Sequence, residues 1–318
     1  MSRGIPRGSP AGRKAIVLPV VCRPMRVLVA GATGTLGLPT VRALAAAGHD
    51  VVGLVRSPEG AAKVEASGAR AAFGDVLDPP SLRAAMHGAE GVVHLAASDR
   101  DFERVRVDGG RNLVGEAVRA GVRRFVVGSG YWIFGHHEGT ITEESGSDEG
   151  GAGRFNLAVE RVALAAARPG VFDVVIGRPG MVYGPGAWFA RAVRELRDGR
   201  YRHVGDGTNR WSPVHPDDAG EAYRALLEHG EPGHVYLVID DAPIAVREFL
   251  SFVADRLGAP PPKPMPPKAQ SLLPRDLARA MAANQAASNV KLKGLGWRPR
   301  FPTFREGVPD VLHAMGPF

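Results

Sequence analysis

The feature that most constrains the fold is a glycine-rich turn between an apolar run and an alanine-rich segment. Residues 27–37 read VLVAGATGTLG, and residues 40–47 continue as TVRALAAA. The apolar run predicts a buried strand, and the segment after it predicts a helix that packs on a sheet. Glycines at such a turn permit tight backbone dihedrals and let the main chain approach a pyrophosphate at the helix N-terminus. This order of elements predicts a dinucleotide site rather than a turn without a ligand.

Strand and helix patterns alternate after this turn. Further strands are expected at residues 49–55, 70–73, 91–96, 123–127 and 172–176, with helical windows at 58–66, 81–87, 102–120 and 157–167. Alternating units with nearly continuous apolar strands predict an α/β fold of the Rossmann type, a doubly wound parallel sheet with helices on both faces. Ligands of such sheets bind beyond the carboxyl ends of the strands.

The regular alternation of strand and helix patterns ends after residue 177. Helical windows at 188–197, 217–228 and 246–257 are separated by longer loops, and the run GAPPPKPMPPK at 258–268 is too rich in proline for a helix interior. We therefore expect residues 25–177 to form the dinucleotide-binding domain. Residues 178–318 are expected to form mostly a small C-terminal substrate-binding lobe, partly interleaved with the sheet.

The first 24 residues differ from the rest of the chain. They are rich in glycine, proline and arginine, and the apolar stretch AIVLPVV within them is short and lacks a small-residue cleavage site. We expect residues 1–24 to be a disordered extension, or the product of a translation start placed too early, with Met25 as the true first residue.

The composition argues against several classes of function. The net charge of +7 is modest, and the basic residues do not form a stripe interleaved with aromatic residues, so a nucleic-acid partner is not expected. The single cysteine, Cys22, excludes an intrachain disulfide and a cysteine-rich metal site. No stretch is long and apolar enough to cross a membrane. These features predict a cytoplasmic protein with a small-molecule substrate and no metal, and they leave a homodimer open.

Several motifs occur together in a familiar order: GATGTLG, GDVLDPPSL, VVHLAA, RPGMVYGPG, VHPDDAGEAY and LGWRPRF. From Met25 to the C-terminus the chain resembles the extended or atypical short-chain dehydrogenase/reductases, the NAD(P)-dependent epimerase/dehydratase group. The resemblance implies a pyrophosphate loop at Gly31, Thr33, Gly34, Leu36 and Gly37, an adenine-framing pair at Asp75 and Val76, and a strand end beside the nicotinamide ribose at Ala96 and Ala97.

Arg56 bears on the choice between the two cofactors. It stands at the end of the second predicted strand, and no acidic residue occurs from residue 51 to 58. An acidic side chain there would bind the adenosine ribose hydroxyls, whereas an arginine can pair with a 2′-phosphate. We therefore favour NADP over NAD, with the alternative that Arg56 is only a solvated loop residue.

The catalytic signature departs from the family pattern. The family uses a tyrosine as general acid/base, a lysine four residues later and a serine or threonine near the substrate oxygen. The motif NLAVE at 156–160 places the expected tyrosine at Ala152 and the expected lysine at Asn156, which could still contact the ribose. The expected serine or threonine falls at Gly130, one residue after Ser129.

Two hypotheses remain open from the sequence. The chain is an atypical reductase or epimerase acting on a small carbonyl or hydroxyl compound, with Tyr131 and Ser129 as candidate catalytic groups, or it is a non-catalytic NADP(H)-binding sensor. The alternative for Tyr131 is an aromatic wall of the pocket. Turnover of NADPH with carbonyl compounds would separate the two hypotheses.

Two further residues are candidates for binding substrate. Tyr183 lies in the RPGMVYGPG motif, and Arg210 lies where an arginine binds substrate phosphate in nucleotide-sugar relatives. The alternative for Arg210 is an ion pair with Asp217 or Asp218. The glycine- and serine-rich residues 139–153 are expected to form a mobile loop that could act as a lid.

Overall fold

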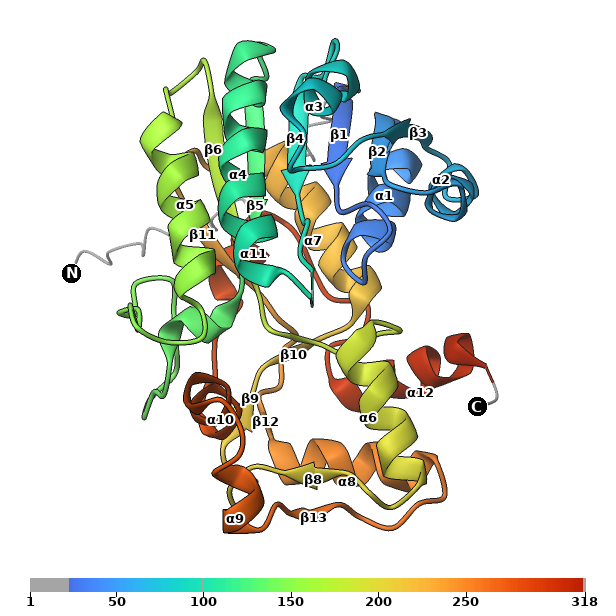
Figure 1. Cartoon of the computed structure of the whole chain (residues 1–318), viewed down its shortest axis with the longest axis vertical. Coiled ribbons are helices and arrows are strands. Elements are labelled where there is room, and N and C mark those ends of the chain that lie inside the picture. The colour runs from blue at the N-terminus through green and yellow to red at the C-terminus, as the bar shows by residue number, and fades with distance from the viewer. Residues whose placement is uncertain (1–22, 99, 317–318) are drawn as a thin grey trace, which may run out of the picture.

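The computed structural model describes residues 23–98 and 100–316 and shows a sheet covered by helices above a smaller lobe (Figure 1). Seven strands form the main sheet in the order β11-β6-β5-β4-β1-β2-β3, and every neighbouring pair is parallel. The predicted doubly wound α/β fold is therefore confirmed. The strands are β1 (Arg26–Ala30), β2 (Asp50–Val55), β3 (Arg70–Phe73), β4 (Gly91–His94), β5 (Arg124–Gly128), β6 (Asp173–Pro179) and β11 (Val235–Val238).

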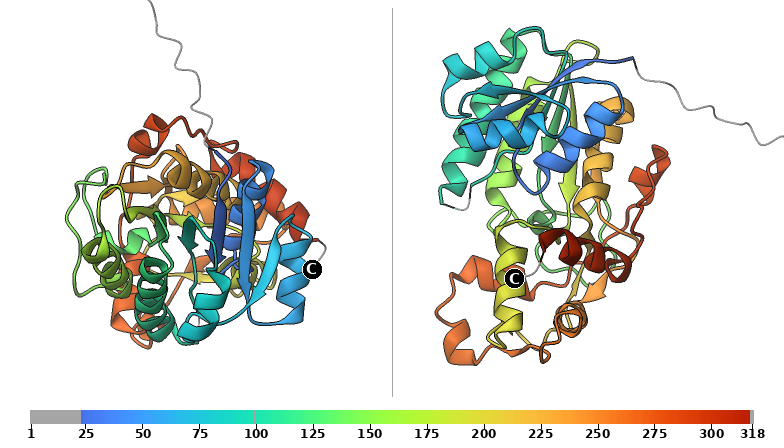
Figure 2. Two further views of the ribbon diagram at one scale, coloured as in Figure 1. Left: turned by 90° about the horizontal axis from the view of Figure 1, so that it is seen from above. Right: turned by 90° about the vertical axis from the view of Figure 1, so that its right-hand side faces the viewer.

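The strands are apolar because both faces of the sheet are covered. Val27, Leu28 and Val29 of the central strand β1 are fully buried, and helices pack on both sides of them. One face carries α1 (Gly37–Ala46), α2 (Pro58–Glu65) and α7 (Pro216–His229), and the other carries α3 (Pro79–Ala85), α4 (Phe102–Arg119) and α5 (Arg154–Ala166) (Figure 2).

The smaller lobe has its own apolar core. Phe189, Phe249 and Phe304 meet there from three helices, and the ring centroids of Phe249 and Phe304 are 5.3 Å apart. Its helices are α6 (Ala187–Arg197), α8 (Val246–Arg256), α9 (Pro267–Gln270), α10 (Arg275–Ala282) and α12 (Phe304–Met315). Its strand pairs are β7 (Met181–Val182) with β10 (Pro213–Val214), β8 (Arg202–His203) with β13 (Lys263–Pro264), and β9 (Arg210–Trp211) with β12 (Ile244–Ala245).

Elements from the second half of the chain belong to both parts of the molecule. Helix α7 and strand β11 complete the sheet, and α11 (Val290–Gly294) packs against β11. Of the expected N-terminal extension, residues 1–22 lie outside the described residues, whereas the guanidinium of Arg23 pairs with Glu90 just before β4. Among the described residues, no helix combines the length and apolar character needed to cross a membrane.

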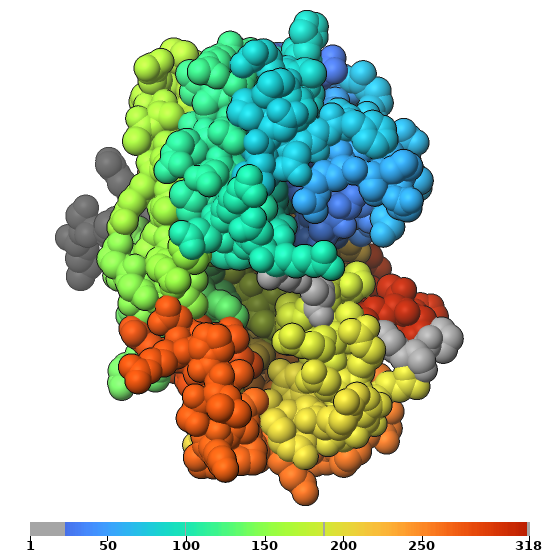
Figure 3. Space-filling view, in the orientation of Figure 1, coloured from blue at the N-terminus to red at the C-terminus, as the bar shows by residue number. Residues whose placement is uncertain are grey.

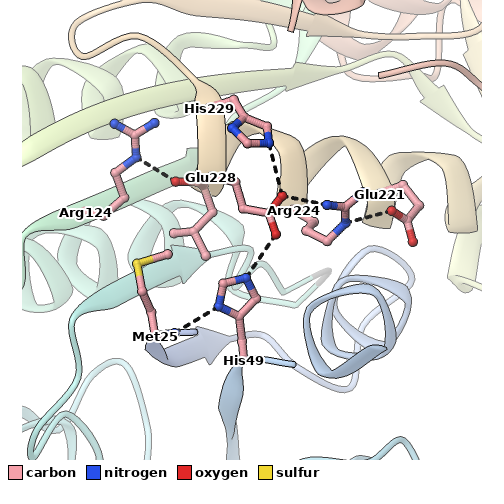
Figure 4. A network of polar contacts seen from close by, with 8 residues as sticks. Met25, His49, Arg124, Glu221, Arg224, Glu228 and His229 are labelled. Carbon is pink, nitrogen blue, oxygen red and sulfur yellow. Dashed lines mark hydrogen bonds and ion pairs between the residues drawn. The ribbon is translucent and has the colours of Figure 1, made fainter. Parts of the chain in front are cut away.

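A buried polar network ties together the starts of β1 and β2 and the end of α7 (Figure 4). The backbone N–H of Met25 donates to His49 Nδ1 at 3.2 Å, so the proton of the ring lies on Nε2, 3.1 Å from Glu228 Oε1. Arg224 donates to the other carboxylate oxygen at 2.6 Å. Burial alone would raise the pKa of Glu228, but the hydrogen bond from His49 and the charge of Arg224 outweigh it and leave the pKa below its usual value.

We expect Glu228→Gln to lower the free energy of unfolding at pH 7 by about 1–3 kcal/mol, since buried charge-assisted hydrogen bonds are lost. A lowered pKa stabilises the fold above the usual pKa of the carboxyl group, and this stabilisation is lost as pH falls through the folded value. The difference from the parent protein should therefore shrink below about pH 4. Urea titration at several pH values measures it. Glu221→Gln, which removes an exposed partner of Arg224, should change stability by less than about 0.5 kcal/mol.

Candidate functional site

A cavity of about 660 Å³ lies between the sheet and the smaller lobe. Its size suits a bound cofactor or organic ligand. Figure 3 shows the boundary it occupies, between the blue and teal segments above and the yellow and orange segments below. The lining includes every residue expected to bind cofactor, namely Gly31, Thr33, Gly34, Leu36, Gly37, Arg56, Asp75, Val76, Ala96, Ala97 and Asn156, together with Ser129 and Tyr131.

The glycine turn has the geometry of a phosphate cradle. Gly31 has φ +84°, and a Cβ there would lie 2.7 Å from the backbone nitrogen of Ala96. A Cβ on Gly37 would lie 1.9 Å from the carbonyl oxygen of Gly31, so α1 packs directly on the turn. Leu36 stands at the N-terminus of α1, and no side chain caps that end. Helix N–H groups facing a cavity without a cap fit an anionic pyrophosphate.

Arg56 lies at the end of β2 beside Asp75. Its guanidinium is 3.8 Å from Asp75 Oδ2, and its side chain is 71% exposed. Asp75 Oδ1 is held by the backbone N–H of Leu77 at 2.9 Å. An exposed pair at this separation contributes little free energy, so the guanidinium is free to turn toward a ligand phosphate.

A buried arginine outside the cavity lining links the ends of β4 and β5. Arg106 on α4 is 2% exposed and donates to the carbonyl oxygens of Ala96 at 3.1 Å and Gly128 at 2.7 Å. Burial lowers the pKa of Arg106 to about 10, which still leaves it protonated at neutral pH. Nothing in the sequence marks Arg106 as buried, because an arginine among polar residues of an amphipathic helix is more typical of a solvated face.

The hydroxyl of Ser129 is already engaged. It donates to Glu160, which also accepts two hydrogen bonds from Arg178, at 3.0 Å from Nε and 2.7 Å from Nη2. Glu160 and Arg178 are both buried. Ser129 therefore anchors the end of β5 to a buried ion pair, and the expectation that its hydroxyl acts on substrate is not supported by this geometry.

Tyr131 begins the short 3₁₀ helix η1 (Tyr131–Phe134) and forms part of the cavity wall. The residue is 3% exposed, and its hydroxyl is buried without a hydrogen-bond partner among the described residues. Burial raises the pKa of Tyr131, so the phenol stays neutral. A neutral phenol in the lining can donate a proton or form an aromatic wall, so the role of Tyr131 stays a prediction.

Two of the three other positions of the expected signature, Gly130 and Asn156, lie close together at the cavity. Asn156 on α5 faces Gly130, where an added Cβ would be 2.8 Å from the Asn156 amide nitrogen. Both residues line the cavity. Ala152 lies in the turn before α5 and is not part of the lining. The cavity therefore offers an amide at the position of the lysine and no tyrosine at Ala152.

Tyr183 and Arg210, expected to bind substrate, do not line the cavity. Tyr183 is fully buried and packs against His215 and Phe249, with ring centroids 5.8 and 6.0 Å away. Arg210 is exposed, and its guanidinium donates to the carbonyl oxygen of Pro243. This also corrects the alternative for Arg210, because Asp217 pairs with Arg42 instead.

The segment expected to be a lid is tied to the smaller lobe. The backbone N–H of Ile141 donates to Ala286 at 2.7 Å, and its carbonyl accepts from Ser288 at 2.9 Å. Glu143 accepts from the backbone N–H of Leu237 in β11 at 3.0 Å. These contacts attach residues 139–153 to the body of the protein and do not favour a free lid. Within the described residues, no three histidine, cysteine or acidic side chains gather to hold a metal ion.

The end of the cavity that faces the smaller lobe is aromatic and apolar. We call this end the lobe chamber. The indole rings of Trp188 and Trp211 meet edge to face there at 6.3 Å, and Trp188 Nε1 donates to the carbonyl oxygen of Val182 at 2.8 Å. These residues were not predicted from the sequence, since no short motif marks them. The lobe chamber is lined by Trp132, Met181, Trp188, Arg191, Tyr201, Trp211, Leu277 and Met281.

Comparison with known proteins gives the family. The family model described as "NAD dependent epimerase/dehydratase family" matches residues 27–238, which include the glycine turn, the ends of β4 and β5 and strand β11. The chain belongs to the NAD-dependent epimerase/dehydratase family. The resemblance inferred from the motifs is thereby confirmed, and the chain is an NAD(P)-dependent enzyme, which disfavours the sensor hypothesis.

The relatives carry several activities. A 3-diazoavenalumate denitrifying reductase of Streptomyces sp. is 33% identical, over 89% of this chain and 99% of its own length. A 4-hydroxy-2-methyl-3-oxo-4-farnesyl-3,4-dihydroquinoline-1-oxide ketoreductase of Stigmatella aurantiaca is 29% identical, over 74% of each chain. The crystal structure of DesIV, a dTDP-glucose 4,6-dehydratase of Streptomyces venezuelae with NAD bound, has a TM-score of 0.76 at 27% identity and covers 91% of this chain and 96% of its own.

Proposed function

We propose that this family member is an NADP(H)-dependent reductase of a small carbonyl compound, or catalyses the reverse oxidation of the corresponding hydroxyl compound. The observation that carries the proposal is one continuous cavity. It joins an uncapped helix N-terminus and Arg56 to the ends of β4 and β5 and then to the lobe chamber. A cofactor and an organic substrate could meet there in one enclosed space.

The cavity offers a suitable group for each successive part of the cofactor. The N-terminus of α1 would hold the pyrophosphate, Arg56 the 2′-phosphate and the amide of Asn156 the nicotinamide ribose. The bound cofactor supplies or accepts the hydride. Arg106 fixes the strand ends beside which the nicotinamide end would lie, because it links the carbonyl oxygens of Ala96 and Gly128.

The absence of a tyrosine and lysine at Ala152 and Asn156 favours reduction over epimerisation. Epimerisation through an oxidised intermediate requires a base that removes a hydroxyl proton and then returns it. Reduction of a carbonyl requires only that one proton reach the oxygen. We propose that the cofactor supplies the hydride and that bulk solvent supplies the proton, while the chain binds and orients the reactants. Three relatives support reduction by name: the two described above and a 2-alkyl-3-oxoalkanoate reductase of Stenotrophomonas maltophilia.

Two measurements test the proposed function. Titration of the protein with NADPH and NADH by tryptophan fluorescence should show tighter binding of NADPH. A panel of carbonyl compounds should then include at least one that is consumed together with NADPH, followed as loss of absorbance at the reduced nicotinamide band. Binding of NADPH without turnover of any compound in the panel would contradict the proposed function and favour the non-catalytic sensor.

Tyr131→Phe should retain activity within about threefold of the parent protein and should not lower the free energy of unfolding, because it removes a buried hydroxyl without a partner. Steady-state rates and thermal melting measure the two effects. Loss of kcat with unchanged cofactor affinity would instead show that the hydroxyl reaches the substrate and acts as the acid.

A further inference from the structure

The lobe chamber differs in chemistry from the cofactor end of the same cavity. Its walls are indole and phenol rings and apolar side chains, contributed by η1, β7, β9, α6 and α10. The indole N–H of Trp188 is already bonded to Val182, so that ring presents its apolar surface. The indole N–H of Trp211 is buried without a hydrogen-bond partner among the described residues and is a donor in this wall. A wall of this kind favours a flat, largely apolar body over a sugar ring or a phosphate, each of which needs several donors.

The residues that line the lobe chamber include one positively charged side chain, Arg191. Arg191 lies on α6, its side chain is 69% exposed, and its contact with Glu195 is long, at 3.9 Å. A surface pair of this kind is weak, so the guanidinium can exchange Glu195 for an anion on a ligand. Tyr201 lines the same end of the cavity. Burial raises its pKa, and the nearby positive charge of Arg191 partly opposes that rise.

The guanidinium of Arg191 therefore lies at the edge of an aromatic wall, with only a weak contact to Glu195. Guanidinium pairs with carboxylate through two parallel hydrogen bonds, whereas a nucleoside diphosphate carries more charge than Arg191 alone would neutralise. Arg210, expected to bind a substrate phosphate, is turned away to Pro243.

We propose that the substrate of this enzyme is a flat, apolar carboxylic acid, whose body rests against the indole rings of Trp188 and Trp211 and whose carboxylate pairs with Arg191. The proposal rests on the proposed function, because it takes the lobe chamber to be the substrate end of the reductase cavity. The reducible group would then point toward the ends of β4 and β5, where the cofactor residues Ala96 and Ala97 lie.

Calorimetric titration with trans-cinnamate and with its neutral analogue cinnamamide tests this directly. The full-length protein is titrated with each probe, both alone and saturated with NADP⁺. We expect cinnamate to bind at least about tenfold more tightly than cinnamamide. In Arg191→Gln the affinity for cinnamate should fall about tenfold while that for cinnamamide stays unchanged.

The matched control is Arg194→Gln, which removes the same charge from an exposed position of α6 outside the cavity lining and should leave both affinities unchanged. Equal binding of acid and amide, loss of cinnamate binding in both variants, or binding of UDP-glucose in place of cinnamate would each overturn the proposal. Absence of NADPH and NADP⁺ binding would instead overturn the proposed function, and the titrations without cofactor keep the two failures distinguishable.

Discussion

Gly37→Ala will lower the free energy of unfolding by more than about 3 kcal/mol, or prevent the protein from folding. The added methyl group would lie 1.9 Å from the carbonyl oxygen of Gly31 and 2.8 Å from the carbonyl carbon of Ala32. Both neighbours are backbone atoms of the turn after β1, so no side-chain rotation relieves the clash. Thermal melting and the yield of folded protein measure the effect.

Two other glycine substitutions separate this packing effect from loss of the ligand site. In Gly34→Ala the nearest atom is the carbonyl oxygen of Gly31, at 3.3 Å, so stability should nearly persist. NADPH affinity should still fall by about tenfold, because the methyl group enters the phosphate cradle. Gly115→Ala meets no atom within 4 Å and should stabilise α4 by about 0.5–1 kcal/mol. Native stability of Gly37→Ala would contradict the packing of α1 on the turn.

Arg56→Glu will weaken NADPH binding by about 100-fold while leaving NADH binding within about threefold. The substitution replaces a guanidinium–phosphate pair with a repulsion between two negative groups, and NADH carries no 2′-phosphate to be repelled. Fluorescence titration with both cofactors measures the ratio. Arg56→Gln, which removes the charge without reversing it, should show an intermediate loss.

A distant substitution controls for the change in net charge. Arg111→Glu alters an arginine of similar exposure on α4, paired with Asp108 and outside the cavity lining, and it should change neither affinity by more than about twofold. Equal weakening of NADPH and NADH by Arg56→Glu would remove Arg56 from the 2′-phosphate position and leave it as a solvated loop residue.

The features that the sequence predicted well are set by neighbouring residues. The glycine turn, the apolar run of β1 and the alternation up to β6 each depend on periodicity or on backbone freedom within a short window. Strand β11 was not predicted because Val235–Val238 stands in a region where strand and helix patterns no longer alternate regularly. Its partner β6 lies far away in the sequence, and periodicity carries no information on such pairing.

The site could be predicted only where a motif and a backbone requirement coincide. All the residues expected to bind cofactor line the cavity, since all but Asn156 on α5 occupy strand ends and a turn whose places the fold dictates. The direction in which a side chain points could not be predicted from the sequence. Tyr183 is fully buried and the hydroxyl of Ser129 is bonded to Glu160. The positions of Arg106 and Arg191 depend on which helix face meets the sheet or the lobe. Those choices are made by tertiary packing.

The path of the chain between its two parts has a consequence for how the enzyme can be divided. After β6 the chain enters the smaller lobe, returns for α7 and β11, leaves again for α8 to α10, returns for α11 and ends in α12 (Figure 1). No single cut separates the two parts, and any contiguous fragment that contains all the walls of the lobe chamber also contains β6, α7 and β11 of the sheet layer. Chimaeras that change substrate preference must therefore exchange several short segments together, and any opening of the lobe must bend all of these crossings at once.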